Sequence, residues 1–259
     1  MLAEERRREI LNLLNTKGIL RTAELCSMFD VSKETIRRDL RVLQEEGHIK
    51  KVYGGVIYPG GPERVETPFM YRERENREEK RKIGVATAQL IGDRETIIID
   101  TGTTLREVAR HIRASYLNVF TNSIPVALEL LEKPNVEVYL IGGKLRAGEL
   151  SLSGHIAEEI LMEFHVDKAI VGAGGLSIRE GLTDYHIEEA SIRRFMIKAS
   201  SKVIVATDHT KLGKVALANV APLSSIHVLV TDSGISPEDK AKFTEAGIQV
   251  IIADYVINS

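Results

Sequence analysis

The sequence lacks the features of an exported or membrane-bound protein. It contains one cysteine, Cys26, and no tryptophan among its 259 residues. A lone cysteine has no disulfide partner in the chain, which is typical of the reducing cytosol, and we expect Cys26 to be a small core residue. No run of 18 apolar residues occurs, and the first residues enter a charged helix without the apolar core of a secretion signal. We therefore expect a soluble, cytoplasmic protein with no membrane partner.

The chain also has little excess of charge of either sign. Residues 1–57 carry a net charge of +2 and the remainder −4, within an overall −2. This mild polarity excludes a bulk positive field, so any affinity for nucleic acid must come from a few Arg and Lys side chains on one face. Hydrophobic residues make up 43% of the chain, which is enough for a sizeable aliphatic core.

The length suits a small module followed by one larger domain. Regular structure is interrupted at Tyr58-Pro59-Gly60-Gly61-Pro62 and again at Thr67-Pro68. We predict a first domain over residues 1–57, a linker over residues 58–76, and a second domain over residues 77–259. The mixed-sign charge cluster from Tyr71 to Lys82 is expected to form the solvated face of a helix.

A helix is predicted to start after Ser32 and to run for about 14 residues. Ile36, Leu40 and Leu43 recur at i, i+4 and i+7 and form one apolar stripe. Ser32 is suited to cap the first turn, and Gly47 is suited to the left-handed conformation that closes a helix.

Two helices are predicted upstream of this one, over Glu4 to Asn15 and over Thr22 to Phe29, with Thr22 as the cap of the second. The short Asp30–Ser32 connection has the length of a helix-turn-helix corner. His48–Gly55 resembles a hairpin. Three helices and a hairpin in this order predict a winged helix-turn-helix, with the third helix directed at the DNA major groove.

We expect this third helix and the wing to contact DNA. Side chains near the helix start would reach bases or nearby phosphates, Arg37 and Arg41 would contact phosphates, and the wing lysines would add backbone contacts. The predicted residues are Ser32, Lys33, Thr35, Arg37, Arg38, Arg41, Lys50 and Lys51. A lone basic helix is usually only a solvated surface, and a winged helix can also serve protein or RNA contacts.

The second domain alternates short β-branched runs with amphipathic helices, which predicts a mostly parallel, Rossmann-like α/β sheet covered on both sides. The predicted strands are Thr96–Ile99, Leu117–Thr121, Val136–Ile141, Lys168–Gly172, Lys202–Ala206, Ile226–Thr231 and Ile248–Ile252. Such sheets bind ligands at the carboxyl ends of their strands.

Small and hydrogen-bonding residues follow several of these strands. Asp100-Thr101-Gly102-Thr103-Thr104 opens directly into a helix over Leu105–His111, and backbone N–H groups at such a helix start bind phosphate. Lys144 or Lys211 would face the phosphate, and Asp184 and Glu189 would bind sugar hydroxyls. The predicted effector residues are Asp100, Gly102, Thr103, Thr104, Thr121, Asn122, Ser123, Gly143, Lys144, Gly174, Asp184, Glu189, Asp208 and Lys211.

No metal, cofactor or catalytic nucleophile is predicted. His155, His165, His186 and His209 lack the paired spacing of metal ligands, and no Gly-x-Ser-x-Gly elbow is present. Isolated histidines of this kind are usually surface or core residues.

Over essentially the whole chain these motifs resemble the DeoR family of bacterial transcriptional regulators. The head pattern is Val31-Ser32-x-x-Thr35-Ile36-Arg37-Arg38-Asp39-Leu40 followed by Gly47 and Tyr53-Gly54-Gly55. The sensor pattern is Asp100-x-Gly102-Thr103-Thr104, Thr121-Asn122-Ser123, Gly142-Gly143, Glu189-Ala190 and Asp208-x-x-Lys211-x-Gly213.

The resemblance implies a cytoplasmic repressor of sugar-utilisation genes that a phosphorylated sugar releases from its operator. It implies a sensor domain similar in fold to ribose-5-phosphate isomerase, with Thr103 and Thr104 in the phosphate loop and Lys211 in the pocket. The isomerases carry acidic residues around a Gly-Ala pair, whereas Gly172-Ala173-Gly174-Gly175 has none. The resemblance therefore implies that the catalytic carboxylates are missing.

Two further expectations follow. A helix-turn-helix regulator pairs two heads on half-sites about 34 Å apart, so we expect a homodimer or homotetramer. The alternative function is a sugar-phosphate isomerase with an appended DNA-binding head, in which Asp184 or Glu189 would be the general base.

Overall fold

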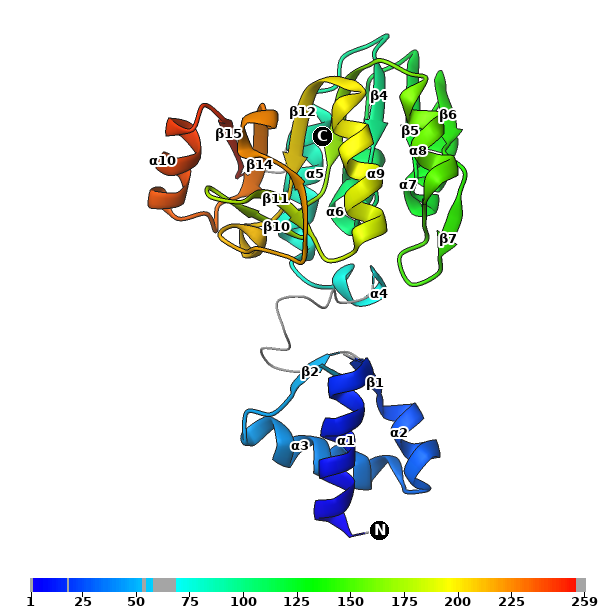
Figure 1. The fold of residues 1–259 in the computed structure, drawn as a ribbon, viewed down its shortest axis with the longest axis vertical. Coiled ribbons are helices and arrows are strands. Elements are labelled where there is room, and N and C mark those ends of the chain that lie inside the picture. The colour runs from blue at the N-terminus through cyan, green and yellow to red at the C-terminus, as the bar shows by residue number, and fades with distance from the viewer. Residues whose placement is uncertain (1, 18, 53–54, 58–68, 255–259) are drawn as a thin grey trace. The chain divides into compact units, whose positions relative to one another are not determined.

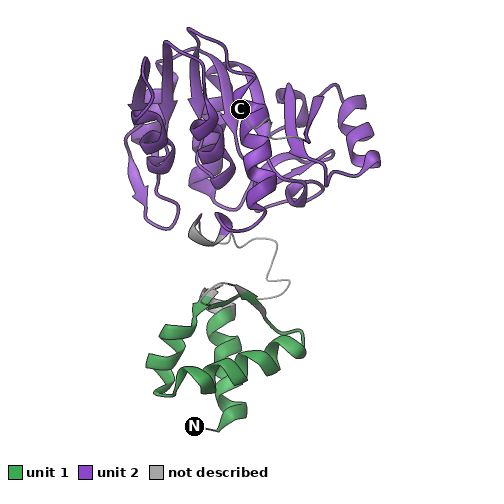
Figure 2. Cartoon of the chain, turned by 180° about the vertical axis from the view of Figure 1, so that it is seen from behind, with its two compact units in different colours: residues 1–67 green, residues 68–259 purple. Residues whose placement is uncertain are grey.

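A computed structural model describes residues 2–17, 19–52, 55–57 and 69–254. The chain divides into two compact units, Met1–Thr67 and Pro68–Ser259, which are coloured separately in Figure 2. Of the predicted linker, residues 58–68 lie outside the described residues, and residues 69–76 belong to the second unit. No helix in the described part of the chain is both long and apolar enough to cross a membrane.

The first unit is a winged helix-turn-helix. Its three strands form an antiparallel sheet in the order β1-β3-β2. Its elements are α1 (Ala3–Lys17), β1 (Ile19–Arg21), α2 (Thr22–Phe29), α3 (Lys33–Glu45), β2 (Lys50–Val52) and β3 (Gly55–Ile57). The predicted stripe of Ile36, Leu40 and Leu43 is buried and packs with Ile10 and Leu25 from the first two helices. This confirms the predicted order of helices and wing.

The ends of α3 follow the sequence prediction. The Ser32 hydroxyl accepts a hydrogen bond from the backbone N–H of Thr35 at 3.2 Å, and Gly47 adopts a left-handed φ of 76°. The predicted cap of α2 is wrong, because Thr22 is already helical and Arg21 occupies the cap position. The backbone N–H of Arg21 donates to the carboxylate of Glu24 at 3.3 Å. This is the hydrogen bond that a glutamate in the first turn makes in a capping box.

The second unit contains a parallel seven-stranded sheet, which confirms the predicted α/β class. Its strand order is β15-β14-β12-β9-β4-β5-β6, and each neighbouring pair is parallel. The strands are β4 (Thr96–Ile99), β5 (Leu117–Thr121), β6 (Val136–Leu140), β9 (Val166–Val171), β12 (Ser200–Ala206), β14 (Val228–Asp232) and β15 (Gln249–Ala253). Each predicted strand is present, with ends shifted by at most two residues.

Helices cover both faces of this sheet (Figure 1). Ile97 and Ile99 of β4 point to one face of the sheet, whereas Ile98 between them points to the other. The first face is covered by α5 (Arg77–Ala88), α6 (Thr103–His111) and α7 (Ile124–Leu131). The second is covered by α8 (His155–Met162), α9 (Ile187–Lys198) and α10 (Pro237–Glu245). Burial on both sides explains why these strands read as continuous β-branched runs.

Shorter elements lie beside the main sheet, and the sequence did not predict them. A hairpin is formed by β7 (Lys144–Arg146) and β8 (Ser151–Ser153). A small antiparallel sheet is formed by β10 (Gly175–Ser177), β11 (Gly181–Asp184) and β13 (Ala218–Ala221). The remaining pieces are α4 (Phe69–Arg72) and the 3₁₀ turns η1 (His209–Lys211) and η2 (Leu223–Ser225).

The order of strands determines where a ligand would bind. From β4 the chain proceeds outward through β5 and β6, then returns to place β9 on the other side of β4. The connections after β4 and β9 therefore diverge at the carboxyl edge of the sheet, and open α/β sheets bind ligands at such a point.

Candidate nucleic-acid interface and effector site

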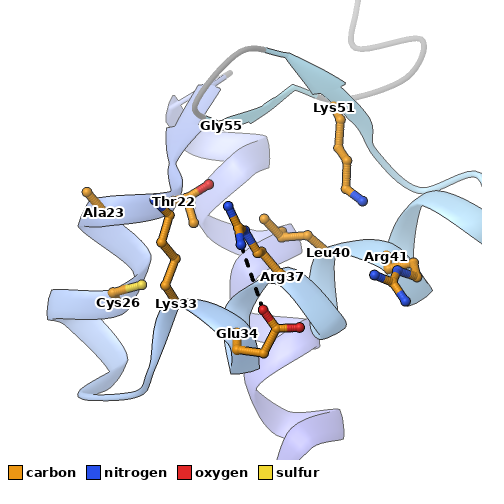
Figure 3. A pocket seen from close by; sticks show the side chains of 10 residues that line it. All are labelled: Thr22, Ala23, Cys26, Lys33, Glu34, Arg37, Leu40, Arg41, Lys51 and Gly55. Atoms are coloured by element: carbon orange, nitrogen blue, oxygen red, sulfur yellow. Dashed lines mark ion pairs between the residues drawn. The ribbon is translucent and has the colours of Figure 1, made fainter.

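A broad groove of about 1040 Å³ crosses the first unit between α2, α3 and the wing (Figure 3). Arg37 and Leu40 come from α3, and Lys51 comes from the strand on the far side. The full lining is Thr22, Ala23, Cys26, Lys33, Glu34, Arg37, Leu40, Arg41, Lys51 and Gly55. Cys26 is half-buried: it packs against the core of the first unit, as expected, and it also lines this groove.

Positive charge dominates this groove. Four of its lining side chains are cationic and exposed, namely Lys33, Arg37, Arg41 and Lys51, against one carboxylate, Glu34. Arg37 and Glu34 form an ion pair at 3.8 Å, drawn as the dashed line in Figure 3, in which both side chains are more than half exposed. Such exposed pairs contribute at most about 1 kcal/mol, so Arg37 can exchange Glu34 for an external anion at little cost.

The other predicted DNA-contacting residues are not among the side chains that line the groove. Ser32 and Thr35 bond to each other through their hydroxyls at 2.9 Å, in addition to the helix cap. Arg38 is exposed on α3 but is not among the groove-lining residues. Lys50 lies in β2, next to Lys51.

A buried charge cluster occupies the carboxyl edge of the large sheet. The Arg193 guanidinium on α9 donates to the carboxylate of Asp100 at 2.5 Å through Nε and to the carboxylate of Asp184 through Nη1. Asp100 also accepts from the backbone N–H of Gly172 at 3.3 Å. All three charged side chains are at most 4% exposed. Arg193 therefore joins the loop after β4 to the small sheet, and Asp100 joins the loop after β4 to the loop after β9.

The two carboxyls of this cluster differ in acidity. Burial raises the pKa of Asp100, and Arg193 limits the rise. Burial also acts to raise the pKa of Asp184, but the Arg193 guanidinium and the backbone N–H of His186 lower it overall. Between two carboxyl groups, the pKa of Arg193 rises above its ordinary value despite burial. Asp184 is thus held as an ion-paired carboxylate.

Glu189 lies in a second polar cluster. Its carboxylate, only 3% exposed, accepts from Arg146 at 2.8 Å and from the Ser151 hydroxyl at 2.7 Å. The adjacent Glu188 is exposed and pairs with Lys144 at 2.9 Å, with 71% of the Lys144 side chain exposed. The structure therefore does not group Lys144 with the buried residues of this edge.

The start of α6 has the predicted form. Gly102 is the cap, with a φ of 141° that disfavours side chains, and no side chain caps the helix. Thr103 and Thr104 in the first turn are buried. Backbone N–H groups in the first turn of a helix that no side chain caps are suited to bind an anion.

The residues after β5 have different roles. Thr121 accepts from the backbone N–H of Ser123 at 3.1 Å, and Ser123 caps α7. The Asn122 amide donates to the carbonyl of Leu152 at 3.2 Å, which attaches β8 to this edge. Its Oδ1 atom is buried without a hydrogen-bond partner in the described part of the chain, as are Thr101 Oγ1 and Ser153 Oγ. Orphaned buried acceptors and hydroxyls beside a polar edge are suited to a ligand or bound water.

The remaining predicted effector residues also lie at this edge. A β-carbon on Gly143 would lie 2.5 Å from the Ser153 carbonyl oxygen, and one on Gly174 would lie 2.9 Å from the Asp184 Cα, so both allow close backbone approach. Asp208 caps η1, accepting from the backbone N–H of Thr210 at 3.0 Å. The Lys211 ammonium lies 5.4 Å from the ring centroid of Tyr185.

Sequence reasoning missed Lys80, which we expected on a solvated helix face. Lys80 is 6% exposed, and its ammonium donates to the backbone carbonyl of Arg72. Burial lowers its pKa to about 8, while Asp208 acts in the opposite direction. The sequence contained a signal for this burial: Lys80, Ile83 and Thr87 are spaced at i, i+3 and i+7, which places them on one face of the helix. That face of α5 is buried.

Sequence reasoning also missed Arg193, although its spacing in the helix indicates a buried position. It follows Glu189 by four residues on the buried side of α9, a spacing that places both side chains on one face. Within the described ranges, no three His, Cys, Asp or Glu side chains are grouped to hold a metal ion.

Comparisons with known proteins agree with both units. The family model described as "DeoR-like helix-turn-helix domain" matches residues 6–60, and the one described as "DeoR C terminal sensor domain" matches residues 75–233. The transcriptional repressor GlcR of Bacillus subtilis is 38% identical, over 90% of this chain and 89% of its own. The transcriptional regulator GolR of Listeria innocua is 35% identical, over 98% and 100%.

The glycerol-3-phosphate regulon repressor of Escherichia coli is 32% identical, over 90% of this chain and 92% of its own. Among solved structures, a ribose 5-phosphate isomerase from Methanocaldococcus jannaschii is similar at 16% identity and a TM-score of 0.39, over 53% of this chain and 55% of its own. That likeness is too distant to imply a shared activity. The two domain matches and the relatives, by contrast, extend over both units. The chain belongs to the DeoR family of helix-turn-helix transcriptional regulators.

Proposed function

We propose that this regulator is a repressor that binds an operator duplex through the groove of its first unit and is released when a phosphorylated sugar binds at the carboxyl edge of its large sheet. The observation that carries the DNA-binding half is the exposed cationic lining of Lys33, Arg37, Arg41 and Lys51. These side chains surround a groove formed by the third helix and the wing, the elements with which winged helices contact a duplex.

Within this interface the side chains have separate roles. Ser32, Lys33, Thr35 and Arg38 contact base edges or adjacent phosphates near the start of α3, and Arg38 is the principal base reader. Arg37, Arg41, Lys50 and Lys51 neutralise phosphates. The placement of Arg37 and Lys51 on opposite sides of the groove supports this division, since phosphate contacts position a protein on DNA without reading its sequence.

A single head reads one half-site, so we propose that the functional form is a homodimer or homotetramer on an operator with two-fold symmetry. Because the proposed partner is an operator duplex, we also propose that the protein acts in the cytoplasm.

The effector half rests on the polar edge of the second unit. The uncapped start of α6, with Gly102, Thr103 and Thr104, would bind the phosphate together with Lys211, whose backbone N–H donates to the Asp208 carbonyl at 3.1 Å. The residues proposed to bind the sugar are Asp100, Thr121, Asn122, Ser123, Gly143, Gly174, Asp184 and Glu189. Lys144 is the weakest candidate, because it is exposed and paired with Glu188.

We propose a sensor and not an isomerase. A general base must be free to take a proton from the substrate. Asp184 is paired with Arg193, and Glu189 is paired with Arg146 and Ser151. Their ion pairs support a binding role, as does the run Gly172–Gly175 without carboxylates.

The DNA-binding half is tested on the full-length protein with a duplex selected from a random library. Operator affinity, measured by fluorescence anisotropy between about 50 and about 200 mM salt, should fall with a log–log slope of about −0.9 per phosphate contacted. Lys51→Ala should reduce the slope by about one phosphate and weaken all sequences alike. Lys242→Ala on α10, where the lysine is exposed and pairs with Glu238, is the control. Affinity independent of salt, or tighter binding to RNA than to any duplex, would reject the proposal.

The effector half is tested by thermal shift against a panel of ribose 5-phosphate, glucose 6-phosphate, fructose 1-phosphate, glycerol 3-phosphate and inorganic phosphate. A ligand at 100 times its dissociation constant adds about 2.7 kcal/mol to the stability of the domain that binds it. Turnover of ribose 5-phosphate that disappears in Asp184→Asn would instead establish an isomerase.

A further inference from the structure

The residues from Phe69 to Lys80 form α4 and the first turn of α5, and we call them the entry segment. Along the chain they follow residues 58–68, which connect the second unit to the first. Phe69 is buried, and Arg72, Glu73 and Asn76 make polar contacts with Glu149, Arg106 of α6 and Asp208. Polar contacts of this kind can be exchanged for contacts to a charged ligand.

Two contacts attach the entry segment to connections that border the proposed effector site. The Arg72 guanidinium pairs with Glu149, a carboxylate 1% exposed in the turn between β7 and β8. The Asn76 amide donates to Asp208 at 3.4 Å, after the end of β12. Both acceptors are buried carboxylates, and a buried carboxylate that loses a hydrogen-bond donor is destabilised. Asp208 keeps the backbone N–H of Thr210 as a second donor at 3.0 Å.

Lys80 lies at the end of the entry segment among charges of both signs. Its ammonium donates to the Arg72 carbonyl and lies in the electrostatic field of Asp208, Arg72 and Lys211. Burial lowers its pKa to about 8, so the charged amine is poorly stabilised here. A dianionic ligand would supply the missing stabilisation.

A phosphate at this position would compete with the carboxylates that hold the segment. It would attract the same cations, Lys80, Arg72 and Lys211, and would be repelled by Asp208 and Glu149. Binding of the anion and retention of both contacts therefore oppose each other, which is the condition for linkage between a ligand and a conformational state.

We propose that the entry segment couples the effector site to the DNA-binding unit: a sugar phosphate held by Lys80 breaks the Arg72–Glu149 and Asn76–Asp208 contacts and so releases the chain that leads to the head. The inference rests on the proposed function, because it requires an anionic effector and an operator. It adds the ligand-contacting residue Lys80 and the element that transmits binding.

The experiment measures operator affinity in the full-length variants Arg72→Met and Asn76→Ala. Without ligand, each should bind operator about tenfold more weakly than wild type, because the contact that the ligand breaks is already lost. Addition of the panel compound that most raises the wild-type melting temperature should weaken their operator affinity by about tenfold more, against about a hundredfold in wild type, because part of the ligand's effect is already present. Their melting temperatures should still rise with that compound. Arg81→Met, on an exposed arginine whose partner Glu78 is 4.0 Å away, is the control.

Lys80→Met tests the ligand contact itself. This variant should lose the ligand-induced rise in melting temperature, and Lys80→Arg should retain it.

Wild-type operator affinity and full ligand response in both Arg72→Met and Asn76→Ala would overturn the coupling while leaving the effector site intact. If no panel compound stabilises the wild type, the effector half of the proposed function fails, and the ligand-free operator affinities alone decide the coupling. If Arg72→Met does not fold, Asn76→Ala decides it.

Discussion

The two units carry their positive charges in opposite ways. In the groove of the first unit, Lys33, Arg37, Arg41 and Lys51 are exposed, and the one ion pair among its lining residues is loose. At the edge of the second unit, Arg193 and Lys80 are buried and each contacts a named internal acceptor. Exposed cations suit a large polyanion that brings its own counter-charge, whereas buried and matched charges suit a small ligand whose binding must rearrange them.

The largest expected effect concerns the buried side of this comparison. Arg193→Met leaves Asp100 and Asp184 without their cation and should lower the free energy of unfolding by about 3–5 kcal/mol. Arg194→Met is a matched control, because the neighbouring arginine is exposed and donates to the Asn219 carbonyl. Urea denaturation of both variants provides the measurement. Equal losses would show that the buried cluster does not hold the two loops together.

The next largest effect concerns the exposed arginines of the first unit, Arg37 and Arg38. Arg38→Ala should cost about 1–3 kcal/mol of operator binding and relax the preference at one base pair. Arg37→Ala should instead weaken operator and random duplex alike, because Arg37 is proposed to contact phosphate. Anisotropy titrations on both duplexes measure the difference. Equal loss on the two duplexes for Arg38→Ala would reject its base-reading role.

A pH dependence distinguishes the two units directly. The pKa of Lys80 is about 8 without ligand, and only the charged amine attracts phosphate, so sugar-phosphate affinity should fall as pH rises above 8, by up to about tenfold per unit. Operator affinity should change little over the same range, because the groove arginines stay charged. Isothermal titration calorimetry would measure the first quantity. Lys80→Arg should abolish the dependence; if it persists, another group is responsible.

The smallest effect separates the two lysines that the sequence offered as phosphate ligands. Lys144→Met should change the free energy of unfolding by at most about 1 kcal/mol and should leave the thermal response to the panel intact, because its pair with Glu188 is exposed. Lys211→Met should reduce that response. The opposite ranking would move the phosphate to the β7–β8 hairpin.

The sequence predicted those features that depend on local periodicity. The helix over α3 was recognisable from Ile36, Leu40 and Leu43, and the parallel sheet from its β-branched runs. Short pairings such as β1 and the β7–β8 hairpin were not predicted, because three residues are too few for alternation to be distinguished from chance.

The candidate sites were predictable in part. Residues such as Asp100, Gly102 and Asp208 follow predicted strands, so topology alone brings them to one edge. Arg193 and Lys80 come from helices, and their burial depends on which face packs against the sheet, which tertiary structure determines. Lys80 in particular was hidden among exposed charges of both signs, where a solvated face is the usual arrangement.

Operator binding by the full-length protein, titrated with and without a sugar phosphate that raises its melting temperature, tests the central claim most directly. The account predicts that saturating ligand weakens operator affinity about a hundredfold, which corresponds to about 2.7 kcal/mol of coupling between the two units. Unchanged operator affinity at a ligand concentration that saturates the melting response would contradict it.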